Sequence, residues 1–208
     1  GSDRVIVIID YGMGNLRSVE NSLKKLGIKY KISGENKDIY EADGLILPGV
    51  GAFRDAMENL QKRRLIIPIR EKVKEGYPFL GICLGMQMLY EAGYEGERSE
   101  GLGFLQGSIK LMEPKEDVKI PHIGWNRLEI KRNHKILKDL SKEAYVYFVH
   151  SYMAVGTKQD EVIAETEYGK INIPALVGRD NIIGAQFHPE KSGEEGLKIL
   201  RSFGEMIK

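Results

Sequence analysis

The first strand-like run of the chain is apolar without alternation, and this feature limits the possible folds most. Residues 5–9 read Val-Ile-Val-Ile-Ile, with no polar side chain among them. A strand with one wet face alternates apolar and polar residues, whereas a strand covered on both faces does not. A predicted helix over 16–26, ended by Gly27, and predicted strands over 28–33 and 43–47 follow. This rhythm predicts a parallel sheet with helices on its faces.

Composition points to an ordinary globular protein. The 208 residues are 42% hydrophobic and 29% charged, and their net charge is only +1, which argues against nucleic acid or an anionic membrane as the main partner. We expect one domain over residues 3–208, with Gly1 and Ser2 left from a cleaved tag. No apolar stretch approaches the roughly 18 residues of a membrane span, and no secretory signal is seen. A cytoplasmic protein is therefore expected.

Cys83 is the only cysteine, which excludes an intramolecular disulfide and a cysteine-rich zinc site. It follows the apolar run 78–82 and precedes a stripe that predicts a helix over 84–92. Glycines at 81 and 85 give the pattern Gly-x-nucleophile-x-Gly, which is typical of a strand-to-helix elbow. The N-terminus of such a helix stabilises a thiolate and a developing oxyanion. The alternative is a buried structural cysteine.

Two glycine-rich loops follow predicted strands. The loop at residues 10–15 lacks the third glycine of a dinucleotide motif because Arg17 occupies that place, so a simple strand-to-helix turn is favoured. The loop at residues 48–51, Pro-Gly-Val-Gly, lacks the Gly-Lys-Ser/Thr of a phosphate loop. It is either an ordinary turn into a helix over 52–62 or a backbone that approaches a small substrate with an N–H aimed at an oxyanion.

A cysteine nucleophile needs a base, and His188 is the best candidate. It follows the apolar run 182–187, at the carboxyl end of a predicted strand, where open α/β sheets place their active sites. Pro189 favours an extended backbone at His188, and residues two apart in an extended segment point to the same side. Glu190 can therefore hold the imidazole, which completes a nucleophile, base and orienting acid. The alternative is a strand end with an incidental acid.

The second half of the chain has a different pattern of predicted elements. Short strand-like runs at close spacing replace the alternation of strands and helices after residue 92, and a helix over 194–206 closes the core. We predict an α/β fold: a three-layer open mixed sheet, mostly parallel with helices on both faces, plus a smaller antiparallel β part. A helix over 64–76 is expected to be kinked or restarted by Pro68.

Three motifs together resemble those of the class I (triad) glutamine amidotransferases: Gly81-Ile82-Cys83-Leu84-Gly85-Met86-Gln87, Pro48-Gly49-Val50-Gly51 and His188-Pro189-Glu190-Lys191-Ser192. Within that class, the stretches 121–126 and 148–152 are similar to those of the glutaminases that serve histidine biosynthesis. The resemblance covers essentially the whole chain, with no departure at a catalytic position. It adds to the chemistry read from the residues and does not replace it.

The resemblance implies that Cys83 attacks the side-chain amide of glutamine, forming a thioester and releasing ammonia. His188 would move the protons and Glu190 would hold His188. Oxyanion donors would be the backbone N–H groups of Leu84 and Val50. One such donor contributes on the order of 10²–10³ in rate, so the conformation of the 48–51 loop could control activity.

Substrate glutamine would, by the same resemblance, be held by Gly51, by Gln87 and by the backbone of Ser151 and Tyr152. Gln87 is one helical turn beyond Cys83 and thus on the same face of the predicted helix. No cofactor and no metal are implied.

The resemblance also implies a partner, because free ammonia is mostly protonated at neutral pH and a lone glutaminase would waste glutamine. The partner would be a (β/α)₈-barrel cyclase subunit that receives ammonia inside a heterodimer. Aromatic anchors are favoured at such interfaces. The residues expected to face the partner are Met13, Asn15, His122, Ile123, Trp125, Asn126 and Lys191.

Two alternative functions and the roles of two residues stay open at this point. The chain could be a glutaminase of another synthase, of the anthranilate, GMP or carbamoyl phosphate type. It could be a flavodoxin-like binding module, which would tolerate Cys83→Ser. Trp125 could be a core aromatic residue, and His150 either supports the site or packs at a strand end.

Overall fold

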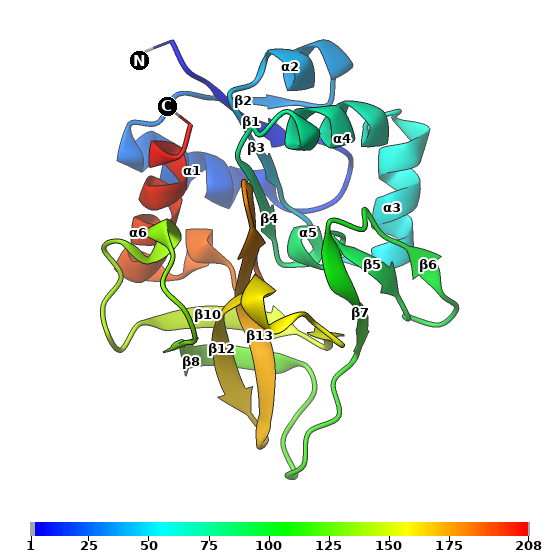
Figure 1. Cartoon of the computed structure of the whole chain (residues 1–208), viewed down its shortest axis with the longest axis vertical. Helices are drawn as coiled ribbons and strands as arrows, with labels where there is room; N and C mark the ends of the chain where they lie inside the picture. The colour runs from blue at the N-terminus through cyan, green and yellow to red at the C-terminus, as the bar shows by residue number, and fades with distance from the viewer. Residues whose placement is uncertain (1–2, 208) are drawn as a thin grey trace.

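An eight-stranded sheet forms the centre of the molecule in the computed structural model, which describes residues 3–207 (Figure 1). Its strand order is β2-β1-β3-β4-β14-β13-β12-β9. The first five strands in this order are parallel and the last three pair antiparallel. The strands are β1 (Ile6–Ile9), β2 (Tyr30–Ser33), β3 (Gly44–Leu47), β4 (Phe79–Ile82), β9 (Glu129–Ile130), β12 (Val162–Tyr168), β13 (Ile171–Arg179) and β14 (Ile182–Ala185).

Helices cover both faces of this sheet, so the predicted three-layer α/β fold is confirmed (Figure 1). Successive residues of β1 point to opposite faces: Ile6 and Ile8 join the core that includes side chains of α1 and α6, whereas Val7 and Ile9 join the core that includes α3 and α4. This explains the unalternating run of apolar residues. The helices are α1 (Leu16–Leu26), α2 (Asn36–Glu41), α3 (Phe53–Lys62), α4 (Ile66–Lys74), α5 (Leu84–Gln87) and α6 (Gly193–Glu205), with 3₁₀ turns η1 (Lys135–Leu137), η2 (Gln159–Glu161) and η3 (Pro189–Lys191).

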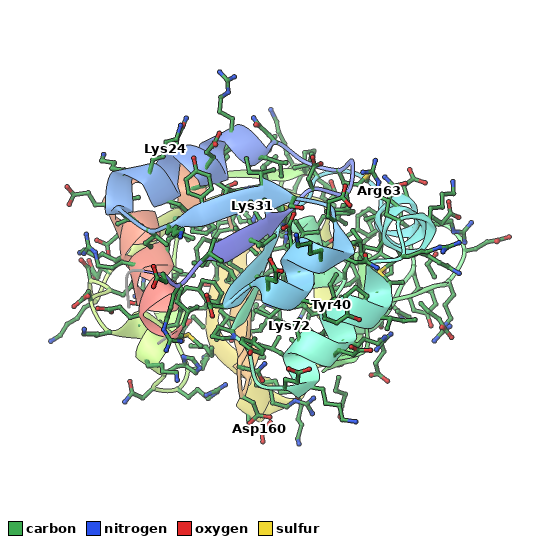
Figure 2. The ribbon with its side chains drawn as sticks, turned by 90° about the horizontal axis from the view of Figure 1, so that it is seen from above. Lys24, Lys31, Tyr40, Arg63, Lys72 and Asp160 are labelled. Atoms are coloured by element: carbon green, nitrogen blue, oxygen red, sulfur yellow. The ribbon has the colours of Figure 1, made fainter. Side chains whose placement is uncertain are left out.

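A buried lysine joins α4 to α2, a short helix that the sequence analysis did not predict. Lys72 and Tyr40 lie close together (Figure 2), and Lys72 donates from Nζ to the carbonyl oxygen of Tyr40 at 2.9 Å. The Lys72 ammonium also lies 3.3 Å from the ring centroid of Tyr77. Burial lowers the pKa of Lys72. The hydrogen bond and the cation–π contact offset that cost.

The second β part contains two small sheets. Strands β8 (His122–Arg127) and β10 (Tyr145–His150) form an antiparallel pair, and β11 (Tyr152–Val155), β7 (Leu105–Leu111), β5 (Tyr90–Gly93) and β6 (Ser99–Glu100) form a four-stranded sheet in that order. Because β5 pairs with β7 in parallel, this sheet is mixed rather than antiparallel as predicted.

The helix predicted over 84–92 is wrong in its second half. The helix α5 ends at Gln87, and the chain then forms β5, in which Tyr90 and Ala92 are buried and Glu91 is exposed. Pairing with β7 decides whether this segment is helix or strand, since its apolar spacing fits either structure.

The predicted kink at Pro68 is also wrong. Pro68 lies in the first turn of α4, where the backbone N–H groups have no partner within the helix, so the missing N–H of proline breaks no helical hydrogen bond.

Among residues 3–207, no helix is both long and apolar enough to cross a membrane. The expectation of a tag remnant at residues 1–2 lies outside the described part of the chain.

Candidate active site

The predicted elbow is present at Cys83, between β4 and α5. Its backbone has φ +55° and ψ −110°, a conformation that is strained for a residue with a Cβ. Two hydrogen bonds hold it there: the Cys83 N–H donates to the Ala185 carbonyl at 2.7 Å, and the Cys83 carbonyl accepts from the Gln87 N–H at 3.1 Å. A side chain at Gly85 would collide with the carbonyl oxygen of Leu47, so only glycine fits at this close approach. The sulfur is thereby fixed at the carboxyl end of β4.

His188 and Glu190 lie at the carboxyl end of β14, the strand that pairs with β4. His188 Nδ1 and Glu190 Oε2 are 2.8 Å apart, and both side chains are only 4% exposed. The His188 N–H donates to the Tyr147 carbonyl at 3.0 Å, and the Ser192 hydroxyl donates to the His188 carbonyl at 2.6 Å. The imidazole is therefore held from both its ring and its backbone, and Nε2 is the nitrogen left without a partner among the described residues.

The electrostatics favour a charged imidazole. Burial opposes the charge on His188, but interactions with Cys83 and Glu190 outweigh it and raise the pKa of His188 to about 10. At neutral pH, His188 is then an imidazolium, with the Glu190 side chain on one side and Cys83 on the other. A cation beside a cysteine stabilises the thiolate, the form of the side chain that acts as a nucleophile.

The opposite side of the site is not in the predicted arrangement. The Leu84 N–H donates to the carbonyl oxygen of Gly49 at 3.3 Å, so this oxyanion donor is occupied. In a trans peptide the carbonyl and the following N–H point in opposite directions. The Val50 N–H therefore points away from Leu84, so the two predicted donors do not face the same point in this conformation of the loop, and their role as oxyanion donors stays a prediction.

The 48–51 loop is packed against the loop that follows β1. The buried Tyr11 hydroxyl donates to the Pro48 carbonyl at 2.7 Å. Burial raises the pKa of Tyr11. Met13 also reaches this loop: its Cε lies 3.0 Å from the position that a Cβ on Gly51 would occupy, and Gly51 has a φ of +116°. The two glycine-rich loops thus form one packed unit, and Val50 on its outer side is 47% exposed.

Of the predicted substrate-binding residues, the structure brings Gln87 and Tyr152 together. Gln87 Nε2 donates to the Tyr152 carbonyl at 3.2 Å. In the antiparallel pair of β11 and β7, Tyr152 lies opposite Leu111. The Met112 N–H donates to the Ser151 carbonyl at 3.0 Å, so the backbone bonds are made by the neighbours of this pair and not between Tyr152 and Leu111 themselves. The N–H of Tyr152 therefore points away from β7, to the same side as its carbonyl and Gln87. Gly51 lies on the packed 48–51 loop.

The sequence analysis missed one buried polar residue of the site, Gln186, and left the role of a second, His150, open. Gln186 is fully buried, and its Nε2 lies 3.8 Å from Cys83 Sγ. It is two residues before His188, so the period-two argument applied to Glu190 could have found it. His150, whose role was left open, is a site residue: its Nδ1 donates to the Tyr152 carbonyl at 2.9 Å. Burial lowers the pKa of His150 to about 4, which keeps it neutral.

Strand β8 divides the predicted partner residues into outward and inward sets. Ile123 is 58% exposed and Trp125 is 53% exposed, so Trp125 is not a core aromatic residue. His122, in contrast, is 1% exposed, because the alternation of the strand turns it inward, where its Nδ1 lies 3.0 Å from His150 Nε2. The expectation that the His122 side chain faces a partner is therefore wrong. Of the remaining four, Asn15 and Lys191 are exposed, and Met13 and Asn126 are half-buried.

The described residues contain no cluster of three or more His, Cys, Asp or Glu side chains that could hold a metal ion. The site thus consists of a fixed cysteine, a charged histidine with its carboxylate, and a glycine loop whose carbonyl fills the oxyanion position.

Comparison with known proteins gives the class first. The family described as Glutamine amidotransferase class-I matches residues 7–206, and the chain belongs to this family. Two solved structures have the same fold at low sequence identity: a glutamine amidotransferase with a TM-score of 0.76 and 21% identity, covering 97% of this chain and 98% of that one, and PurLQS from Thermotoga maritima with 0.78 and 19%, covering 99% of both.

More similar relatives carry one name, imidazole glycerol phosphate synthase subunit HisH. The protein from Caldanaerobacter subterraneus subsp. tengcongensis is 53% identical over 204 residues, which cover 98% of this chain and 99% of the relative. The protein from Lactococcus lactis subsp. lactis is 52% identical over 202 residues, covering 97% and 98%.

Proposed function

We propose that this chain is the glutaminase subunit of an imidazole glycerol phosphate synthase. It hydrolyses L-glutamine to glutamate and ammonia and passes the ammonia to a cyclase subunit in histidine biosynthesis. Residues 3–208 act as one amidotransferase domain, in the cytoplasm. The identity of about one half to the HisH subunits over nearly the full chain supports the pathway.

One observation carries the catalytic part of the proposal. Cys83 and the pair His188–Glu190 come from the ends of two adjacent parallel strands, and the pair is joined at 2.8 Å inside a site that is almost closed to solvent. A binding module has no use for a buried imidazolium beside a strained cysteine. A cysteine hydrolase needs both.

Acylation begins from the thiolate and imidazolium. The Cys83 sulfur attacks the side-chain amide carbon of glutamine, and the amide oxygen becomes an oxyanion. The C–N bond then breaks, the leaving nitrogen takes a proton from His188 Nε2, and ammonia departs from a thioester. Glu190 stays ionised and keeps the His188 Nδ1 proton in place.

Deacylation uses the same groups. Water loses a proton to His188 Nε2 and its oxygen adds to the thioester carbon. The second oxyanion collapses, the C–S bond breaks, and the electron pair returns to sulfur, which leaves glutamate and the starting charge pair. Gln87 and the Tyr152 N–H hold the polar end of the substrate, with Gly51 and Ser151 beside them.

Both oxyanions need N–H donors, and in the present conformation a carbonyl faces that position. We infer that the peptide between Gly49 and Val50 turns over during activation, so that the Val50 N–H replaces the Gly49 carbonyl and the Leu84 N–H is released. Its neighbour, the 10–15 loop, carries Met13 and Asn15. Contact of a partner with this loop offers a physical route from complex formation to the oxyanion position.

The proposed partner is a (β/α)₈-barrel cyclase subunit, bound in a heterodimer. Its docking surface on this chain is centred on Ile123 and Trp125 and includes Met13, Asn15, Asn126 and Lys191. Exposed aromatic and aliphatic side chains on a β-strand are the kind of anchor that dominates such interfaces.

The test is glutamate release from glutamine by the purified chain, alone and mixed with the cyclase subunit of one of the relatives plus its nucleotide ligand. We expect strong stimulation by this partner and no activity in Cys83→Ala. Stimulation only by a different synthase would retain the triad and reject the pathway. Absence of glutaminase activity with every partner would reject the enzyme.

A further inference from the structure

Gln186 is the buried polar residue of the site to which the reaction above gives no role. It follows the last residue of β14, and its N–H donates to the Ala175 carbonyl at 2.9 Å, so the extended geometry of β14 continues through it. Its side chain is 0% exposed, and the two hydrogen-bond partners of its amide both belong to the site. Oε1 accepts from Gln87 Nε2 at 3.1 Å, and Nε2 lies 3.8 Å from the sulfur of Cys83.

The hydrogen-bond network around Gln87 fixes which way the Gln186 amide points. The Tyr152 carbonyl can only accept, so the Gln87 group that faces it must be the NH₂ group. The second proton of that NH₂ group is directed at Gln186, which must therefore present its oxygen. The NH₂ group of Gln186 is left to face Cys83.

The same carbonyl is anchored from the other side. His150 donates to it from Nδ1 at 2.9 Å, and His150 Nε2 in turn lies 3.0 Å from His122 Nδ1. The side chains of Gln87, Gln186, His122 and His150 are buried and Tyr152 is half-buried, so solvent does little to weaken the hydrogen bonds that orient these groups. The donor at the end of this network points at sulfur.

We propose that Gln186 is a further catalytic residue, whose side-chain amide donates a hydrogen bond to the Cys83 thiolate and is held in this donating orientation by Gln87. The inference rests on the proposed function, since it takes Cys83 as the nucleophile. A hydrogen bond to an ionised acceptor is roughly twice as strong as one between neutral groups. The amide therefore favours thiolate over thiol.

The geometry of α5 makes this donor important. The helix is a single turn, Leu84–Gln87, so its dipole is much smaller than that of the long helix predicted from the sequence. Cys83 interacts electrostatically with two ionisable side chains, those of His188 and Tyr11, and of these only His188 carries a charge at neutral pH. The carbonyl of Val149, 3.8 Å from the sulfur, accepts from the thiol and repels the thiolate. Gln186 thus supplies the neutral donor that balances this carbonyl.

The donor acts in both halves of the reaction. Before acylation it stabilises the attacking thiolate, and in deacylation it stabilises the thiolate that leaves when the C–S bond breaks. It is not needed for the thioester itself, whose sulfur carries no charge. Loss of the donor should therefore lower kcat with little effect on KM.

The first experiment is alkylation of Cys83 by iodoacetamide over a pH series, with the full chain and three variants. In Gln186→Met, which keeps the volume and removes the donor, we expect the midpoint of the profile to rise by about one pH unit, so that alkylation at a pH below both midpoints slows about tenfold. Gln186→Glu keeps the acceptor for Gln87 and puts a carboxylate oxygen against sulfur, so its shift should be larger.

The matched control is Asn181→Leu. Asn181 precedes the same strand at its other end, and its amide donates to the Val73 and Tyr77 carbonyls at 2.9 and 2.7 Å. This variant loses two hydrogen bonds from a side-chain amide without touching the site. It should be less stable than wild type but keep the wild-type alkylation profile.

A wild-type profile in a folded Gln186→Met protein would overturn the inference. Should both Gln186 variants fail to fold, the side-chain amide protons of Gln186 in the wild-type chain can be followed by NMR. They should shift as Cys83 ionises and stay constant in Cys83→Ala, and constant positions in both proteins would also overturn the inference. Glutamate release that survives Cys83→Ala would instead reject the proposed function, so the two failures are distinguishable.

Discussion

Two turns at the carboxyl edge of the same sheet differ in how close they are to a reacting geometry. The elbow at Cys83 already has its nucleophile beside a charged histidine, and its strained backbone is held by hydrogen bonds to the strand beside it and to α5. The 48–51 loop presents the Gly49 carbonyl where an oxyanion would need a donor. One half of the proposed catalytic machinery is therefore assembled and the other half is blocked.

The difference follows from what holds each turn. The elbow is built into two strands of the central sheet, so it cannot move without disturbing the core. The loop is held by the Tyr11 hydroxyl and by the bond from the Leu84 N–H, and one such hydrogen bond contributes a net of only about 1 kcal/mol. A partner that binds the neighbouring 10–15 loop could supply that energy.

The largest expected effect comes from breaking the assembled half. Cys83→Ala should lower glutamate release in the complex by a factor on the order of 10⁴ or more, because nothing else can form the thioester. Far-UV circular dichroism should show an unchanged fold. Activity within tenfold of wild type would mean that the elbow is not catalytic.

Glu190→Gln weakens the same half without removing the nucleophile. The amide cannot stabilise an imidazolium as the carboxylate does, so kcat should fall on the order of 10²-fold while KM changes little. The measurement is steady-state glutamate release in the complex. An equal loss through KM alone would instead give Glu190 a role in substrate binding.

The raised pKa of His188 also predicts a pH dependence of stability. A group whose pKa is higher in the folded state stabilises the fold fully below its unfolded pKa and loses this contribution as pH rises through the folded value. For His188 that window runs from 6.5 to about 10. Denaturant unfolding of wild type should give a free energy of unfolding that falls across this window. In Glu190→Gln the fall should be shallower, and equal slopes would contradict the coupling.

Trp125→Ala tests whether the blocked half depends on a partner. Trp125 is 53% exposed, so its truncation should leave the free energy of unfolding nearly unchanged but weaken binding of the cyclase by about 2 kcal/mol, roughly 30-fold in Kd. Ile67→Ala is the matched control, since Ile67 is 67% exposed on α4 at the other end of the molecule (Figure 1). Equal effects of the two changes on Kd would reject the proposed surface.

Tyr11→Phe should have the smallest effect. It removes the hydrogen bond to the Pro48 carbonyl and loosens the blocked loop, so partner-free glutamate release should rise about fivefold, the factor that corresponds to about 1 kcal/mol. Activity in the complex should change less. Lower partner-free activity would mean that this bond maintains the catalytic conformation rather than the blocked one.

The sequence predicted the parts of the molecule that local pattern determines. The unalternating run at residues 5–9, the glycines around Cys83, and the spacing of His188 and Glu190 are local patterns, and the structure contains the buried strand, the elbow and the His188–Glu190 pair that they favoured. The length of α5 was wrong because Met88 to Ala92 fits a helix or a strand, and only pairing with β7 decides between them. The strand β8 is not evident from local sequence, because the residue that it buries, His122, is polar.

The orientation of the Gly49–Val50 peptide could not be predicted at all. It depends on a hydrogen bond between residues 35 positions apart, from Leu84 to Gly49, and local sequence carries no information on it. Gln186 is the opposite case, since its position two residues before His188 was a usable signal. Polar residues inside apolar runs near a candidate base are worth testing for contact with the nucleophile.

The most direct test of the contrast between the two turns measures both in the same samples. Alkylation of Cys83 by iodoacetamide reports on the elbow, and glutamate release reports on the complete site, each with the chain alone and in the complex with its cyclase and nucleotide ligand. We expect alkylation to change less than about threefold on complex formation, while glutamate release rises on the order of 10²–10³, the contribution of an oxyanion donor. Full glutamate release by the chain alone, or alkylation that rises in step with release, would contradict the account.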